Sequence, residues 1–198
     1  MRTSRIALAL LSLPLALSAQ GGGGGAPAAP PTDPLVAVFR GRINGLERNI
    51  AIAFDSIPES KFSYKPTPAQ LTIGYVAQHL ANDNYLFCNA FGDMKATRPA
   101  DETSTPDSVK ATWPKAKLVA SLKESFTFCQ AAAGQLVDSK LTEMVELRFG
   151  ANARQVPRAQ MVLGHALDLS DHYSQLANYM RLNGILPPSA LPRPAARP

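Results

Sequence analysis

The amino-acid sequence predicts an all-α fold, a four-helix bundle with a long crossover between its second and third helices. Four segments of roughly 22–28 residues each carry one apolar stripe at helical spacing. A polar stretch, residues 92–112, separates the second segment from the third and is long enough to let those two helices run in the same direction. Hydrophobic residues make up 45% of the chain, which is sufficient for a real core.

The N-terminal residues 1–19 are typical of a secretory signal peptide. Two arginines precede the apolar run Ile6–Leu17, and small residues follow it at suitable cleavage positions. The run is too short to span a bilayer, so we expect an exported protein, periplasmic or extracellular, without a stable membrane anchor after cleavage. An uncleaved anchor is the alternative. Residues 20–32, rich in glycine and proline, are expected to be a linker before a domain at 33–189.

The first helix is predicted to begin at Asp33-Pro34, because aspartate is a good N-cap and proline suits the first helical position. Pro58 is expected to end it. Between them the apolar residues recur every three or four positions, at Leu35, Phe39, Ile43, Leu46, Ile50, Phe54 and Ile57.

The second helix is predicted to begin at Thr67–Gln70, which has the pattern of a capping box with proline at the first helical position. It is expected to run to about Phe91, before Gly92. His79 and Asp83, four residues apart, share one face of this helix. The predicted inner face carries Val76, Leu80, Phe87 and Ala90.

The third helix is predicted to follow Pro114, and the last to begin at Pro157 and end at the cap Asn183-Gly184. Between them the alternating sequence in residues 138–156 is compatible with a brief strand or an ordered loop. Residues 190–198 are expected to be a disordered tail. The inward residues of the third helix are Leu118, Leu122, Phe126, Cys129, Ala133 and Leu136.

Polar side chains interrupt the apolar stripe of the last helix. Burying imidazoles and a carboxylate is costly unless they are paired or bind a metal. Two of the chain's three histidines lie here, and the third, His79, lies on the second helix. The stripe consists of Met161, His165, Asp168, His172, Leu176 and Tyr179.

These residues predict a metal site between the second and last helices. Asp168 and His172 are one turn apart and can bind one ion, with His79 as the third ligand. Two imidazoles and a carboxylate suit zinc, nickel or ferrous iron. The alternative is a buried polar network without metal. His165 could replace Asp168 as ligand or orient it, and Asp83 could likewise orient a ligand or pair with a basic side chain.

Several short motifs in order resemble the DinB-like (DinB/YfiT) family of metalloenzymes. They are Tyr64–Pro68, His79 within Gly74–Leu80, Asp171–Leu176, and Tyr179–Gly184 followed by two prolines. The resemblance covers roughly 33–189 and implies a four-helix bundle. It also implies a divalent metal held by one histidine of the second helix and an H-x-x-x-H pair of the last. His79 and His172 match two of those positions, and Asp168 stands at the other.

Cys88 and Cys129 are expected to form a disulfide, because paired cysteines in an exported chain favour one. In the chain-entropy model this closure contributes roughly 4 kcal/mol. Cys88 lies off the predicted inner face, and two buried free thiols or a redox pair are the alternatives.

The predicted metal site favours hydrolase- or transferase-like chemistry on a small molecule, and the resemblance to the DinB-like family implies thiol-dependent transfer as one form of it. The alternative is a non-enzymatic helical bundle that binds a ligand or partner, and a homodimer is compatible with either. Without residues 1–19 the chain has 18 basic and 15 acidic residues, and no basic run indicates nucleic-acid binding.

Overall fold

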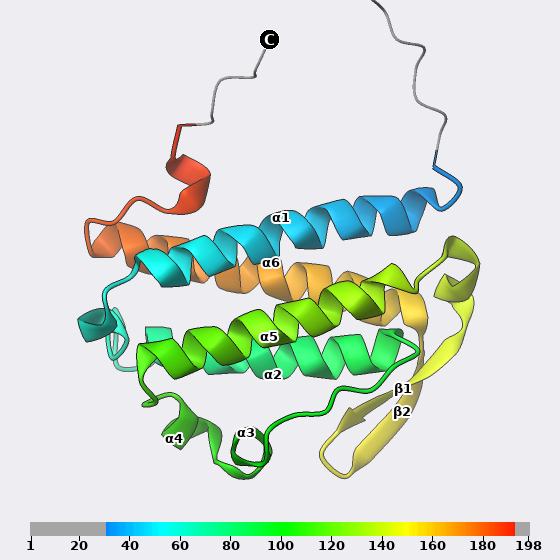
Figure 1. Cartoon of the computed structure of the whole chain (residues 1–198), viewed down its shortest axis with the longest axis horizontal. Coiled ribbons are helices and arrows are strands. Elements are labelled where there is room, and N and C mark those ends of the chain that lie inside the picture. The colour runs from blue at the N-terminus through cyan, green and yellow to red at the C-terminus, as the bar shows by residue number, and fades with distance from the viewer. Residues whose placement is uncertain (1–30, 193–198) are drawn as a thin grey trace, which may run out of the picture. The chain divides into compact units, whose positions relative to one another are not determined.

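The computed structural model describes residues 31–192. The predicted signal peptide, most of the predicted linker and residues 193–198 of the predicted tail lie outside that range. Within it the chain is a four-helix bundle, as predicted (Figure 1). Its long helices are α1 (Pro34–Ser56), α2 (Ile73–Phe91), α5 (Lys115–Gly134) and α6 (Arg158–Leu182).

The long crossover has the predicted effect on helix direction. Figure 1 shows α2 and α5 running the same way, with α1 and α6 running the opposite way. The crossover is not irregular throughout, because it contains the short helices α3 (Ala100–Ser104) and α4 (Asp107–Lys110). Buried Lys110 helps to hold it, since its Nζ donates to Asn82 Oδ1 and pairs with Asp107.

The core lies between the four long helices and is built largely from the predicted stripes. Leu35 is the exception in α1, because it lies in the first turn and is 65% exposed. Each large aliphatic or aromatic side chain that is fully buried contributes about 1.5–3 kcal/mol. Such side chains include Ile43, Ile50, Phe54, Leu80, Phe91, Leu118, Leu122 and Leu136.

A residue distant in sequence caps α1. Asp33 precedes the helix as predicted, but its carboxylate accepts from the backbone N–H of Asp138. The carboxylate of Asp138 in turn accepts from the N–H groups of Leu35 and Val36, at 3.1 and 2.8 Å. Free N–H groups of a first helical turn need such acceptors. The short 3-10 helix η2 (Asp138–Thr142) is thereby tied to α1.

The predicted start of α2 was wrong by about one and a half turns. Thr67–Gln70 forms a separate turn, closed by the bond from Gln70 N–H to the Thr67 carbonyl. The cap is Thr72, whose Oγ1 accepts from Tyr75 N–H at 3.1 Å. Backbone carbonyls of the loop before α2 also accept hydrogen bonds from the first N–H groups of α2. This loop contains the 3-10 helix η1 (Glu59–Lys61).

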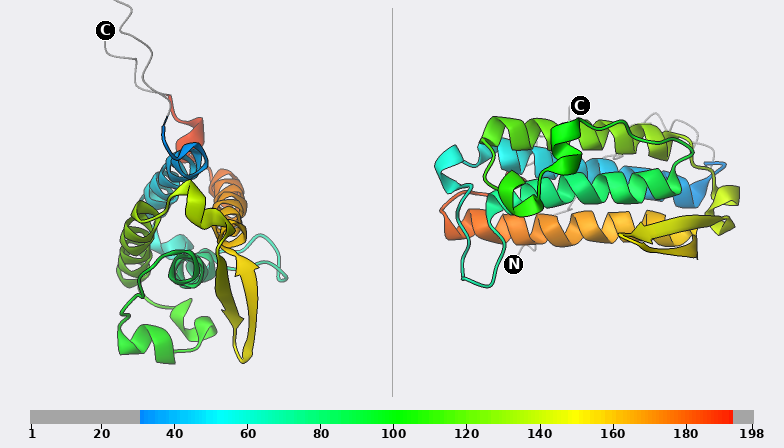
Figure 2. Two further views of the ribbon diagram at one scale, coloured as in Figure 1. Left: turned by 90° about the vertical axis from the view of Figure 1, so that its right-hand side faces the viewer. Right: turned by 90° about the horizontal axis from the view of Figure 1, so that it is seen from below.

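Strands β1 (Met144–Phe149) and β2 (Asn152–Pro157) form an antiparallel hairpin, where the sequence left strand and loop open. Its turn uses Gly150, which has a positive φ of 57° that suits glycine. Leu147 and Val156 are buried against the bundle, so the hairpin is anchored on one face (Figure 2).

The predicted cap of the last helix is confirmed. Gly184 has φ 71°, its N–H donates to Arg181 O, and Ile185 N–H donates to Met180 O. These two bonds define a Schellman motif. The 3-10 helix η3 (Pro188–Ala190) follows.

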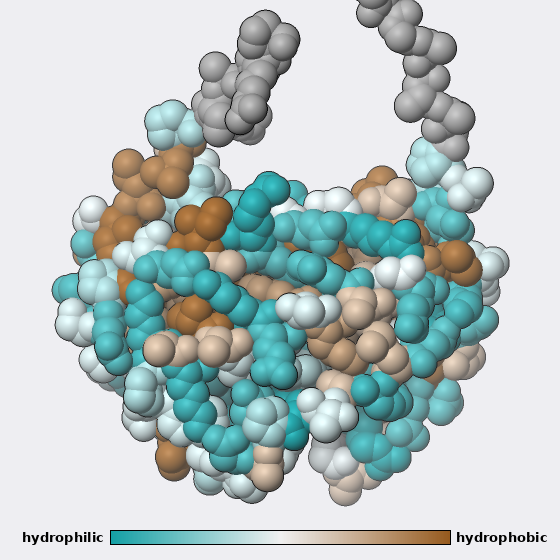
Figure 3. Space-filling model, viewed as in Figure 1, coloured by the Kyte–Doolittle hydropathy of each residue, from teal (hydrophilic) through white to brown (hydrophobic). Residues whose placement is uncertain are grey.

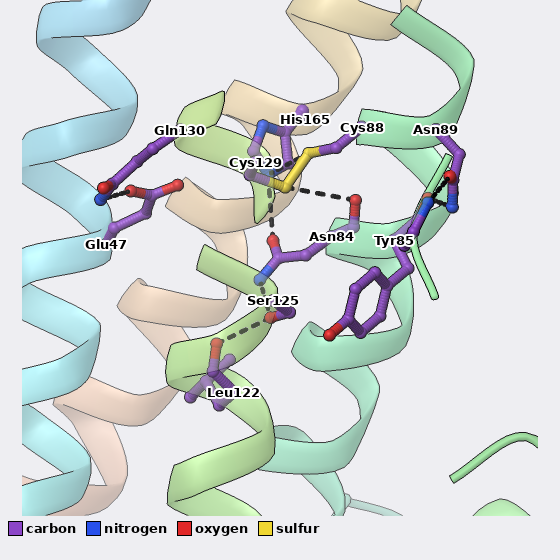
Figure 4. The surroundings of a disulfide bond; sticks show 11 residues. Glu47, Asn84, Tyr85, Cys88, Asn89, Leu122, Ser125, Cys129, Gln130 and His165 are labelled. Atoms are coloured by element: carbon purple, nitrogen blue, oxygen red, sulfur yellow. Dashed lines mark hydrogen bonds between the residues drawn. A yellow bond between two sulfur atoms is a disulfide. The ribbon is translucent and has the colours of Figure 1, made fainter. Parts of the chain in front are cut away.

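The predicted disulfide joins Cys88 of α2 to Cys129 of α5 (Figure 4). Both cysteines are fully buried. Cys88 does not lie off the inner face, because the face that α2 buries runs through Ala77, Ala81 and Asn84 to Cys88. Phe87 and Ala90, predicted inward, are only partly buried.

None of the helices within residues 31–192 is both long enough and apolar enough to cross a membrane.

Candidate metal centre

Four metal-competent side chains converge between α2 and α6. His79 and Asp83 come from α2, and Asp168 and His172 come from α6, each pair one helical turn apart. His79 Nε2 lies 3.1 Å from Asp83 Oδ2, and His172 Nε2 lies 3.5 Å from Asp168 Oδ1. The two imidazole rings meet edge to face with centroids 4.8 Å apart. The structure therefore brings the three predicted ligands, His79, Asp168 and His172, together. Asp83 lies beside them as a fourth candidate.

The tightest group contains Asp83 in place of Asp168. Ligand atoms of His79, Asp83 and His172 all lie within 4.8 Å of one another. Asp168 adjoins this group through His172, and its Oδ2 is buried without a hydrogen-bond partner among residues 31–192. A buried carboxylate oxygen in this condition is an unused acceptor.

Residues further along α6 orient His172. Its Nδ1 lies 3.2 Å from Gln175 Oε1, and Gln175 Nε2 donates to the hydroxyl of Tyr179 at 3.0 Å. The tautomer with its proton on Nδ1 satisfies this contact and leaves the Nε2 lone pair facing the other three side chains. Gln175 was missed at the sequence level, although its i, i+3 spacing from His172 could have indicated it.

Burial shifts the protonation of the group. Burial raises the pKa of Asp83 to about 6. It also raises the pKa of Asp168 to about 6, with repulsion from Asp83 as a second cause. Burial, followed by repulsion from His172, lowers the pKa of His79 and favours the neutral imidazole that metals require. A divalent cation would offset the repulsion between the two partly desolvated carboxylates, so these donors fit a metal.

The remaining histidine lies elsewhere. His165 is fully buried beside the disulfide, with Nε2 3.0 Å from Asn84 Oδ1 and 3.9 Å from Cys88 Sγ (Figure 4). Its ring is surrounded by Phe39, Phe87 and Phe91. Burial lowers its pKa to about 3, so it stays neutral. The structure does not bring His165 into the group around His79.

The site is accessible from solvent, and cavities lie on both sides of it along α2. The side chain of His79 is 32% exposed, whereas that of His172 is 11% exposed. Towards the start of α2, the ring of Tyr75 lies 6.1 Å from that of His79 and lines a cavity of about 660 Å³. Towards its end, a cavity of about 380 Å³ is lined by Leu86 and Ala90. Both volumes are in the range of small-molecule sites.

Comparison with known proteins identifies the fold. No family model and no curated protein matches the chain. Among solved structures, a DinB-like protein from Bacillus cereus is 18% identical with a TM-score of 0.59, over 76% of this chain and 93% of that one. A DinB-like protein from Bacillus subtilis is also 18% identical, with a TM-score of 0.55, over 74% of this chain and 92% of that one.

A third similar structure is that of a mycothiol-dependent maleylpyruvate isomerase. It is 11% identical with a TM-score of 0.55, and the match covers 73% of this chain and 60% of the isomerase. These likenesses show that the chain has the fold of DinB-like proteins. The resemblance predicted from the sequence motifs is thus confirmed at the level of the fold.

Proposed function

We propose that this chain is an exported DinB-like metalloprotein that holds a divalent metal, zinc, nickel or iron, between α2 and α6. Its reaction class would be hydrolysis or thiol-dependent transfer on a small molecule. The observation that carries this proposal is the convergence of ligand atoms of His79, Asp83 and His172 from two helices. Two ligands of one zinc ion are at most about 4.2 Å apart, so small side-chain adjustments close the observed group around an ion.

Each side chain of the group has a role in this proposal. The imidazoles of His79 and His172 and the carboxylate of Asp83 would hold the metal. The bound metal would acidify a water or a thiol and polarise the electrophile. Asp168, with its unused buried oxygen, would accept a proton from a group bound beside it. Gln175 would keep His172 in the ligating tautomer.

Two further observations support the reaction class and the compartment. A neighbour in fold is named a mycothiol-dependent isomerase, which supports thiol-dependent transfer as a candidate. The buried disulfide is typical of chains that mature in an oxidising compartment, which supports export. Sequencing the N-terminus of secreted material tests export, since the mature chain should begin near Ala19 or Gln20. A cytoplasmic protein that begins at Met1 would contradict it.

The second candidate function is that of a non-enzymatic binding protein with a metal-free polar network. The contacts from His79 to Asp83 and from His172 to Asp168 favour it, since each imidazole already has a carboxylate neighbour. In that case the four side chains would satisfy one another by hydrogen bonds and ion pairs.

Metal content of the purified protein distinguishes the two candidates. We expect about one ion per chain after loading with zinc, nickel or iron, measured by elemental analysis. His79→Ala and His172→Ala should each lose most of it, and Asp83→Asn should lose more than Asp168→Asn.

His165→Asn is the matched control, because this histidine is buried but lies outside the group. The metal content of this variant should stay at the parent level. Sub-stoichiometric metal in the loaded parent protein would reject the metalloprotein and favour the polar network. Loss of metal in Asp168→Asn but not in Asp83→Asn would restore Asp168 as the third ligand.

A further inference from the structure

An electropositive cavity lies at the C-terminal end of α2, between the segment that follows this helix and strand β1. Its volume is about 380 Å³. Lys95, Arg98 and Arg148 line it against one acidic residue, Glu146. Figure 3 shows a notch in the surface between the crossover and the hairpin. The excess of positive charge indicates an anionic ligand.

Arg98 is held in place by an aromatic ring, an amide and one carboxylate. Its Cζ lies 4.3 Å over the ring of Tyr85, and Nη2 donates to Asn82 Oδ1 at 2.8 Å. Nη2 of Arg98 also forms an ion pair with Oε2 of Glu102, at 3.5 Å. The Nε of Arg98 is buried and finds no hydrogen-bond partner in the described part of the chain. A buried donor without a partner is unfavourable.

The other two cations differ in how far they are neutralised. Lys95 Nζ donates to the backbone carbonyl of Asn89 at 2.8 Å, and no ion pair joins it to a carboxylate within residues 31–192. Arg148 pairs with Glu146 on the same strand, at 3.0 Å. Glu146 and Glu102 therefore each pair with one arginine, and Lys95 leaves the cavity with an excess of positive charge.

The cavity is adjacent to the proposed metal centre. Leu86 and Ala90 form its apolar floor and follow His79 and Asp83 along one stripe of α2. Asp83 and Leu86 are three residues apart, a rise of about 5 Å along the helix. An anion bound here would therefore lie within a small molecule's length of the metal ligands.

We propose that this cavity binds the anionic group, a carboxylate or a phosphate, of a small substrate whose apolar body lies on Leu86 and Ala90. The placement of that substrate beside a metal rests on the function proposed above. The anion site itself rests only on the cavity and its charges, so the two proposals fail separately.

Ligand-observed NMR titration on the full mature protein tests the anion site. Benzoate and phenyl phosphate serve as the two anionic probes, and benzamide is the neutral match. We expect both anions to bind more tightly than benzamide, and the tighter of them identifies the preferred group. Lys95→Gln/Arg148→Gln should weaken anion binding about tenfold, because two cations are removed. Glu146→Gln should strengthen it.

Arg154→Gln is the matched control, because Arg154 lies on the other strand of the same hairpin and does not line the cavity. Its anion affinity should equal that of the parent. Equal binding of benzoate and benzamide, or anion binding unchanged in Lys95→Gln/Arg148→Gln, would overturn the anion site. Circular dichroism of each variant verifies that the bundle is folded.

Zinc binding by equilibrium dialysis on the same proteins separates the two proposals. Lys95→Gln/Arg148→Gln should keep zinc, and His172→Ala should lose zinc but keep the anion. A parent protein that binds the anions selectively but binds no zinc, nickel or iron would refute the metal centre and support the anion site. A parent protein that binds zinc but neither anion would refute the anion site and support the metal centre.

Discussion

Glu47 permits a quantitative test of how burial controls ionisation in this bundle. It lies in α1 and is 2% exposed. Its Oε2 accepts from Gln130 Nε2 at 2.8 Å (Figure 4), and its Oε1 is buried without a partner among the described residues. Burial raises the pKa of Glu47 from 4.5 to about 7, against the smaller opposite effect of the Gln130 hydrogen bond. Between these two pKa values the folded protein keeps Glu47 protonated, whereas the unfolded chain has lost the proton.

The direction of the pH dependence follows. Between about pH 4.5 and 7 the folded state binds more protons at Glu47, so the free energy of unfolding falls as pH rises through this window and is constant above it. At 1.36 kcal/mol per pKa unit, the loss attributable to this one group is about 3 kcal/mol. Glu47→Gln cannot ionise, so its contribution does not change with pH.

Urea unfolding of both proteins at pH 4.5, 6 and 8 measures the effect, with the disulfide intact. The stability of Glu47→Gln relative to the parent should rise by about 3 kcal/mol between pH 4.5 and 8. Any constant cost of burying the amide cancels in this comparison. Glu124→Gln, an exposed change on α5, is the control and should show no such trend. A relative stability that is independent of pH would refute the reasoning.

Three further changes should alter stability measurably. Cys88→Ala/Cys129→Ala should cost about 4 kcal/mol in urea unfolding, because the disulfide closes a loop with a sequence separation of 41; an unchanged midpoint would contradict this. Gly74→Ala should lower Tm at a cost of about 1–3 kcal/mol, because an added Cβ would lie 2.4 Å from a backbone oxygen of the crossover. Gly41→Ala, which meets nothing within 4 Å, should be neutral or stabilising, and equal effects of the two glycine changes would refute the clash. Asp138→Ala should cost about 1 kcal/mol through loss of the α1 cap, and urea stability equal to the parent's would show that the cap contributes nothing.

Much of the candidate site could be predicted from helical periodicity alone. On α6 the spacing placed Asp168 and His172 on the buried stripe, and the structure keeps them there, because 3.6 residues per turn leaves little freedom. His165 shares that stripe, yet it points to the disulfide. Periodicity shows which face of a helix a residue lies on. It does not show which residues of the facing helix lie opposite that residue.

The sequence by itself determined the apolar stripes of α1, α5 and α6 and part of that of α2, together with the crossover that makes α2 and α5 parallel, the glycine cap at Gly184 and the pairing of the cysteines. These depend on local backbone preferences and on burial of one helical face, which are readable from spacing. Only the tertiary structure decided that Thr72 begins α2, that Asp138 caps α1 and that Asp83 joins His79 and His172. The last two depend on where segments distant in sequence meet, and that is set by how the helices pack. The cap at Thr72 is a local bond to Tyr75 N–H, and carbonyls of the preceding loop, those of Tyr64 and Phe62, reinforce this start by accepting from Ile73 and Gly74.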